Sequence, residues 1–230
     1  MEPFAYSDGD QALSGLLFRA AGAPRALVAA FPTIWNVTPA VETKAKALAD
    51  QGFTVLIADF YGAAPDGLEQ ANRWADALRA DPAIYRQRLR AALDALRSEG
   101  PGLPMLAIGF CMGGQAVLEM ARDGADLRAA VSFHGLLDTR RPAKPGAIKP
   151  RVLVCHGDAD PLVPRSQVMA FWEEMDASQA DWHFHAYGRV KHGFTNPAPP
   201  PGHAVVAYDN SADHHSWQSA LLLFEEVLAG

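Results

Sequence analysis

The sequence predicts a single α/β domain over residues 1–230, built on a mostly parallel β-sheet with helices on both faces. Short, continuous apolar runs such as Arg25–Phe31 are typical of strands buried on both faces. These runs alternate with stretches of helical length, as expected for a parallel sheet. No repeat, low-complexity tract or linker divides the chain, and 230 residues can bury a sizeable core.

The expected elements follow from turn and cap signals along the chain. Residues 4–19 predict a hairpin around Ser7-Asp8-Gly9-Asp10. Thr38 as N-cap and Pro39 at the first helical position begin a helix that ends at Gly52, and Asp81-Pro82 begins another. We expect further strands over 25–31, 53–58, from 105, 127–133, 151–156 and 182–187, and helices over 39–52, 68–80, 82–98, 115–122, 166–176 and 211–228.

Composition and charge exclude several classes of partner. The net charge is −6 with no basic cluster, so neither nucleic acid nor an anionic membrane is an expected partner. No apolar run approaches the roughly 18 residues of a membrane span. The first residues lack a signal-peptide pattern, and the two cysteines, Cys111 and Cys155, are expected as free thiols, which predicts a cytoplasmic protein. The sequence favours no particular oligomeric state.

The stretch Met105–Gln115 predicts a strand, a tight turn and a helix with Cys111 at the tip. Its Gly109-Phe-Cys-Met-Gly113 pattern matches the nucleophile elbow G-x-S-x-G with Cys in place of Ser. Small neighbours permit the strained backbone of the elbow, and the following helix N-terminus favours a thiolate. A buried cysteine in a Gly-rich turn is the alternative. The dinucleotide fingerprint does not fit, because Cys111 takes its middle glycine position.

Two further residues follow predicted strands in the order that a catalytic triad needs. Asp160 lies in His156–Pro164, and His192 lies in Lys191-His-Gly-Phe194. Nucleophile, acid and then histidine is the chain order of the α/β-hydrolase triad. Taken singly, each is equally typical of an ordinary loop. The competing residues are Asp158 as the acid, and His203, His214 and His215 as the base.

These motifs together resemble the dienelactone hydrolase family, cysteine-dependent members of the α/β-hydrolase fold. The resemblance rests on Gly109–Gly114, Gly157–Pro164, Lys191–Phe194 and Ala58–Gly62, and it extends from about residue 25 to the end of the chain. It implies Cys111 as nucleophile, Asp160 as acid and His192 as base. We expect neither a cofactor nor a metal, because the one histidine pair with ligand spacing, His183 and His185, has no evident third metal ligand.

The chain departs from the family pattern at two positions. Thr33 stands where the family commonly has a Glu that contacts the resting thiol, and Asn196 stands where it carries an Arg that binds the substrate carboxylate. An anionic substrate therefore needs another cation. The arginines that we consider are Arg73, Arg79, Arg140 and Arg189.

We therefore expect a hydrolase that opens an enol lactone or activated ester, with a small-molecule substrate of the dienelactone type. The backbone N–H groups of Met112 and Ile34 are expected to hold the oxyanion. A broad carboxylesterase acting on neutral esters and a catalytically silent binding module are the alternatives. The residues expected to line the substrate pocket are Thr33, Trp35, Phe110, His134, Phe194 and Asn196.

Overall fold

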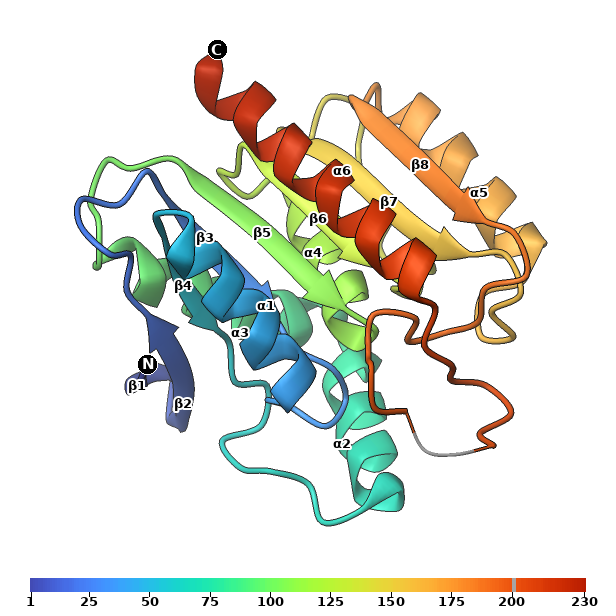
Figure 1. The fold of residues 1–230 in the computed structure, drawn as a ribbon, viewed down its shortest axis with the longest axis horizontal. Helices are drawn as coiled ribbons and strands as arrows, with labels where there is room; N and C mark the ends of the chain where they lie inside the picture. Colours follow the sequence, from blue (N-terminus) through green and yellow to red (C-terminus); the bar gives the residue numbers. More distant parts are fainter. Residues whose placement is uncertain (200–201) are drawn as a thin grey trace.

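The computed structural model describes residues 1–199 and 202–230 and contains one eight-stranded sheet (Figure 1). The strand order is β1-β2-β4-β3-β5-β6-β7-β8. Strands β3 to β8 run parallel, and the hairpin of β1 and β2 joins them antiparallel through β4. The strands are β1 Glu2–Asp8, β2 Gln11–Phe18, β3 Ala26–Phe31, β4 Phe53–Ile57, β5 Met105–Phe110, β6 Ala129–Phe133, β7 Arg151–Gly157 and β8 Trp182–Tyr187.

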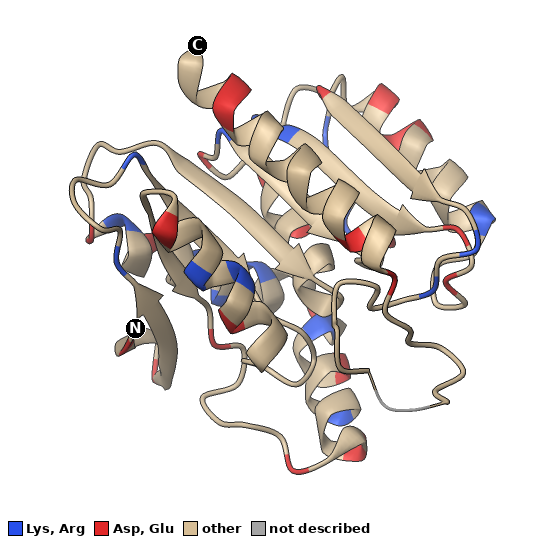
Figure 2. Cartoon of the chain, in the orientation of Figure 1, with Lys and Arg blue, Asp and Glu red and all other residues tan. Residues whose placement is uncertain are grey.

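Helices cover both faces of this sheet, so the predicted α/β architecture is confirmed. Helices α1 and α6 pack on one face, and α2, α3, α4 and α5 pack on the other. The central strands β3, β4, β5 and β6 are buried along their whole length, which explains their continuous apolar sequences. Figure 2 accordingly shows Lys, Arg, Asp and Glu mainly on helices and loops. The helices are α1 Pro39–Asp50, α2 Leu68–Ala80, α3 Pro82–Arg97, α4 Met112–Arg122, α5 Arg165–Ala177 and α6 Asn210–Ala229.

Helices α1 and α3 begin at the caps that the sequence predicts. The Thr38 hydroxyl accepts the N–H of Val41 at the start of α1, and the Asp81 carboxylate accepts the N–H of Ala83 at the start of α3. Helix α4 differs from the prediction, because it begins at Met112 rather than at Gln115. The reason is that Cys111 alone makes the turn, so its carbonyl already accepts helical bonds from the next residues. No helix within 1–199 and 202–230 has both the length and the apolar character to cross a membrane.

Two glycines allow β5 and α4 to meet closely enough to form the turn. A Cβ at Gly109 would overlap the carbonyl oxygen of Gly113, and a Cβ at Gly113 would overlap the carbonyl oxygen of Phe31 at the end of β3. The start of α4 is therefore pressed against the ends of two adjacent strands. Because parallel strands present their carboxyl ends at one edge of the sheet, residues that follow β3, β5, β7 and β8 converge there.

This close approach predicts that Gly109→Ala destabilises the fold by about 2 kcal/mol or more, since a buried carbonyl cannot move away at low cost. Thermal unfolding measures the change. The control is Gly188→Ala, where a Cβ would meet no atom within 4 Å, and we expect it to stay within about 0.5 kcal/mol of the wild type. Equal stability of the two variants would contradict the packing described for the turn.

Candidate active site

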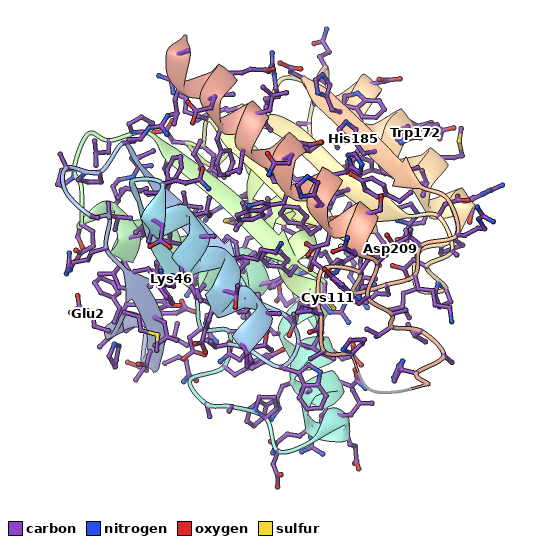
Figure 3. The ribbon with its side chains drawn as sticks, viewed as in Figure 1. Glu2, Lys46, Cys111, Trp172, His185 and Asp209 are labelled. Atoms are coloured by element: carbon purple, nitrogen blue, oxygen red, sulfur yellow. The ribbon has the colours of Figure 1, made fainter. Side chains whose placement is uncertain are left out.

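Cys111 lies at the tip of the β5–α4 turn with its side chain partly exposed to a cavity. Its φ angle is +57°, in a region that non-glycine residues rarely adopt. Figure 3 labels Cys111 where β5 ends and α4 begins. Helix α4 begins at the residue that directly follows this strained position.

His192 and Asp160 form a buried pair beside this thiol. The Nδ1 of His192 lies 2.7 Å from Oδ2 of Asp160, and both side chains are almost fully buried. The other carboxylate oxygen of Asp160 accepts the N–H of Leu162 at 2.9 Å. Because an ionised carboxylate can only accept, Nδ1 of His192 is the donor. Its Nε2 has no partner of regular hydrogen-bond geometry within the described residues, and it faces the Cys111 sulfur.

The thiol and the imidazole shift each other's pKa in opposite directions. Burial alone raises the pKa of the Cys111 thiol, but the adjacent charge of His192, with two nearby backbone amides, lowers it below its ordinary value. Burial alone lowers the pKa of His192, but the charge of Cys111 and the bond to Asp160 raise it to about 10. A thiolate and an imidazolium are therefore the favoured pair of states near neutral pH.

The two amides are those that the sequence predicts for an oxyanion hole. The backbone N–H groups of Met112 and Ile34 lie near the Cys111 sulfur and help to lower the pKa of its thiol. Met112 is the first residue of α4, and Ile34 lies in the loop between β3 and α1. An anion that develops next to Cys111 would face the same two donors.

His134 lies closer to the nucleophile than its predicted place in the pocket implies. It directly follows β6, and its Nδ1 accepts the backbone N–H of Cys111 at 3.1 Å. Its Nε2 therefore carries the proton and donates to Oγ1 of Thr195 at 2.9 Å. Burial, aided by the charge of His192, holds the pKa of His134 well below its ordinary value. The ring is thus a neutral support, stacked edge-on against the ring of His192 at 5.2 Å.

Beside Cys111 is a cavity of about 370 Å³ with mostly apolar walls. Five of the six residues predicted to line a pocket do line it: Thr33, Trp35, Phe110, His134 and Asn196. The prediction for Phe194 is wrong. Its side chain is fully buried behind the cavity, packed edge-on against His134 and Tyr187. Leu68 and Leu162, together with Trp35, are exposed large apolar side chains in the cavity wall, and no local sequence signal marks these two leucines as wall residues.

None of the four arginines considered as carboxylate clamps lines this cavity. Arg79 and Arg140 line a separate cavity of about 210 Å³, which also contains Asp76, Glu119 and Asp138. Among the described residues, the wall beside Cys111 contains neither Lys nor Arg, and it contains no Asp or Glu.

Of the four competing candidates, His203 lines the cavity beside Cys111, whereas Asp158, His214 and His215 do not. Asp158 pairs with Arg165 at 2.6 Å, and the Nδ1 of His203 accepts backbone N–H groups of the loop that it belongs to. His214 and His215 lie within α6. His185 lies on β8, well away from Cys111 in Figure 3. No group of three or more His, Cys, Asp or Glu within 1–199 and 202–230 is arranged to hold a metal ion.

Comparisons with known proteins cover nearly the whole of this fold. The family model described as dienelactone hydrolase family matches residues 13–228. The solved structure of a protein named m3DLH is 37% identical with a TM-score of 0.91, over 98% of this chain and 97% of that one. A dienelactone hydrolase-like promiscuous phosphotriesterase from metagenomic libraries is 35% identical with a TM-score of 0.89, over 98% and 97%. An uncharacterised protein of Caenorhabditis elegans is 37% identical over 156 residues, 63% of this chain and 94% of that protein.

The pKa directions predict the pH dependence of thiol alkylation. Because the pKa of Cys111 is lowered, its reaction with iodoacetamide should stay fast as the pH falls through about 8.5, where an ordinary thiol becomes protonated. His192→Ala removes the cation and leaves burial, so the rate near neutral pH should fall at least about tenfold and recover at higher pH.

Mass spectrometry of the labelled site measures both rates. Cys111→Ala is the control, because burial raises the pKa of the remaining Cys155 to about 12 and that thiol should stay unlabelled. A wild-type profile that follows an ordinary thiol, or a His192→Ala rate equal to that of the wild type, would contradict the ion pair.

Proposed function

Since the chain belongs to the dienelactone hydrolase family, we propose that it hydrolyses activated carboxylic esters or enol lactones through a triad of Cys111, His192 and Asp160. The observation that carries this proposal is the paired shift at the turn, where the Cys111 thiol has a lowered pKa and His192 a raised one. A group that is activated in the resting protein and lies beside a substrate-sized cavity supports nucleophilic catalysis.

The proposed reaction proceeds in two halves. The Cys111 thiolate attacks the carbonyl carbon, and the oxyanion lies between the N–H groups of Met112 and Ile34. Collapse breaks the bond to the leaving oxygen, which takes the proton from Nε2 of His192 and leaves an acyl thioester. The neutral His192 then takes a proton from water, and the hydroxide attacks the thioester. The carboxylic acid is released, and the thiolate–imidazolium pair of Cys111 and His192 is regenerated. Asp160 holds the imidazole in orientation throughout.

A thiolate nucleophile restricts the substrates. It is itself a good leaving group, so the tetrahedral intermediate goes forward only when the departing oxygen is a better one. An aryl oxide or the enolate of an enol lactone meets this condition, whereas an unprotonated amide nitrogen does not. The site is therefore matched to activated esters and enol lactones rather than to peptides.

The cavity walls favour a neutral substrate over the carboxylate of a dienelactone. With no Lys or Arg among the described wall residues, a bound carboxylate would lose hydration, and the His192 imidazolium is already paired with the Cys111 thiolate. Thr33, Asn196 and Thr195 offer only neutral polar groups. We therefore rank neutral, apolar esters and lactones ahead of the anionic dienelactone.

This ranking predicts that the wild type turns over a neutral p-nitrophenyl ester with a higher kcat/KM than a cis-dienelactone. Cys111→Ala should lose at least about a thousandfold of the ester activity, since it removes the nucleophile. Asn196→Arg should raise kcat/KM for the dienelactone about tenfold by pairing its carboxylate, with Asn196→Gln as the uncharged control. A wild type that prefers the dienelactone would contradict a neutral-substrate site.

Phosphotriester cleavage is a second candidate, favoured by the similarity to the promiscuous phosphotriesterase and by the lack of Lys, Arg, Asp and Glu in the described cavity wall. A neutral triester places no charge in the cavity, and attack by the thiolate on phosphorus would expel an aryl oxide. Stopped-flow release of p-nitrophenolate from a dialkyl p-nitrophenyl phosphate tests it. Several equivalents per enzyme would establish turnover, whereas a single equivalent would show only covalent inhibition.

The remaining alternative, a catalytically silent binding module, requires an unreactive Cys111. The lowered pKa of the thiol and the adjacent amides support catalysis instead. We also place the protein in the cytoplasm, because both cysteines are free thiols and a reducing compartment preserves a reactive thiolate.

A further inference from the structure

The loop that contains Ile34 has a defined turn at its centre. The N–H of Asn36 donates to the carbonyl oxygen of Thr33 at 3.0 Å, and the N–H of Trp35 donates to the Thr33 hydroxyl at 3.2 Å. Neither bond uses the N–H of Ile34, which faces the Cys111 sulfur. The direction of this amide therefore depends on the residue that closes the turn.

Asn36 closes the turn. It differs from an ordinary loop residue both in its backbone conformation and in the contacts of its side chain. Its φ angle is +64°, which Asn and Gly tolerate better than other residues. Its Nδ2 donates to Oδ1 of Asp59 at 2.7 Å and to the carbonyl oxygen of Ala63 at 3.3 Å, and its Oδ1 accepts the N–H of Phe60 at 3.1 Å. With 7% exposure, the side chain is buried. It ties the loop after β3 to the loop after β4.

Asp59 is fixed in turn by bonds that do not involve the active site. Its Oδ1 also accepts the N–H groups of Tyr61 and Gly62, both at 2.9 Å. Its Oδ2 accepts the N–H of Ser14 on β2 at 2.8 Å. At 3% exposure this carboxylate is a buried anchor, satisfied from three sides, to which Asn36 is attached.

We propose that Asn36 and Asp59 are a positioning pair that holds the Ile34 amide at the place where the oxyanion forms. The pair touches neither the thiol nor the cavity contents and acts through the amide two residues before Asn36. The inference rests on the proposed ester hydrolysis. The physical basis of the proposal is that an oxyanion donor is effective only when it is preorganised. A turn that lacks its buried anchor does not hold the Ile34 amide in a fixed direction.

Two reactions of Cys111, acylation and alkylation, distinguish the positioning of the Ile34 amide from general structural support of the loop. Acylation by an ester passes through an oxyanion and needs the Ile34 amide in place. Alkylation by iodoacetamide displaces iodide at a saturated carbon and forms no oxyanion. A positioning pair should therefore affect acylation far more than alkylation, when both are measured at a pH where the thiol is ionised.

The test is Asn36→Gly, which keeps the positive φ without strain and removes the buried amide. We expect kcat for the p-nitrophenyl ester to fall about 10- to 100-fold, with KM and the alkylation rate within about twofold of the wild type. Gln179→Gly is the matched control, since Gln179 has a φ of +57° in an exposed turn after α5. It should leave both reactions unchanged.

Other outcomes overturn the proposal in distinguishable ways. Equal losses of acylation and alkylation would make the pair a loop scaffold, and unchanged kcat would remove it from the mechanism. If Asn36→Gly does not fold, Asp59→Asn replaces it, because it keeps the side-chain volume, removes the anchoring charge and is judged by the same ratio. A wild type without acylation at Cys111 would instead contradict the proposed function itself.

Discussion

The ion pair between Cys111 and His192 requires stabilising groups on several sides, and the surrounding structure supplies them. A thiolate next to buried groups is costly unless cations and N–H donors surround it. Here the donors come from α4 through Met112, from the loop after β3 through Ile34, and from the imidazole after β8. These three segments meet because β3 and β5 are neighbours in a parallel sheet and β8 ends at the same edge. The order of the strands therefore determines the chemistry available at that edge.

Two residues at this ion pair have a strained backbone. Cys111 and His134 both have positive φ angles, and each directly follows a central strand. The two residues stabilise each other, since the N–H of Cys111 donates to the ring of His134, whose low pKa keeps that nitrogen an acceptor. A protonated His134 would break this bond and place a second cation beside His192. The neutral ring thus preserves both the turn and the polarity of the ion pair.

Signals local to the sequence predicted much of this arrangement. The spacing of Gly109, Cys111 and Gly113 predicted the turn because steric crowding acts between residues close in the chain. Asp160 and His192 were predicted from their places after strands, and the structure brings them to 2.7 Å. What their side chains do in a reaction remains a prediction.

Partners distant in the chain were not predictable in this way. Asn36 and Asp59 are 23 residues apart, and their bond depends on the adjacent pairing of β3 and β4 rather than on any local pattern. Phe194 was misplaced for a related reason, since an aromatic residue beside a functional histidine packs equally well into a core or a cavity wall. The sequence shows that it is apolar, but only the packing shows which way it faces.

Thr33 links the activation of the thiol to the choice of substrate. An acidic side chain at this point of the cavity wall would oppose the thiolate electrostatically, and Thr33 instead directs its hydroxyl to the N–H of Trp35. The described wall thus contains no Asp or Glu that competes for His192 and no Lys or Arg that attracts an anion. A nucleophile that is ionised before substrate arrives needs no substrate charge to activate it. A described wall without Lys, Arg, Asp or Glu is consistent with that, because selection among esters then rests on apolar fit and on the quality of the leaving group.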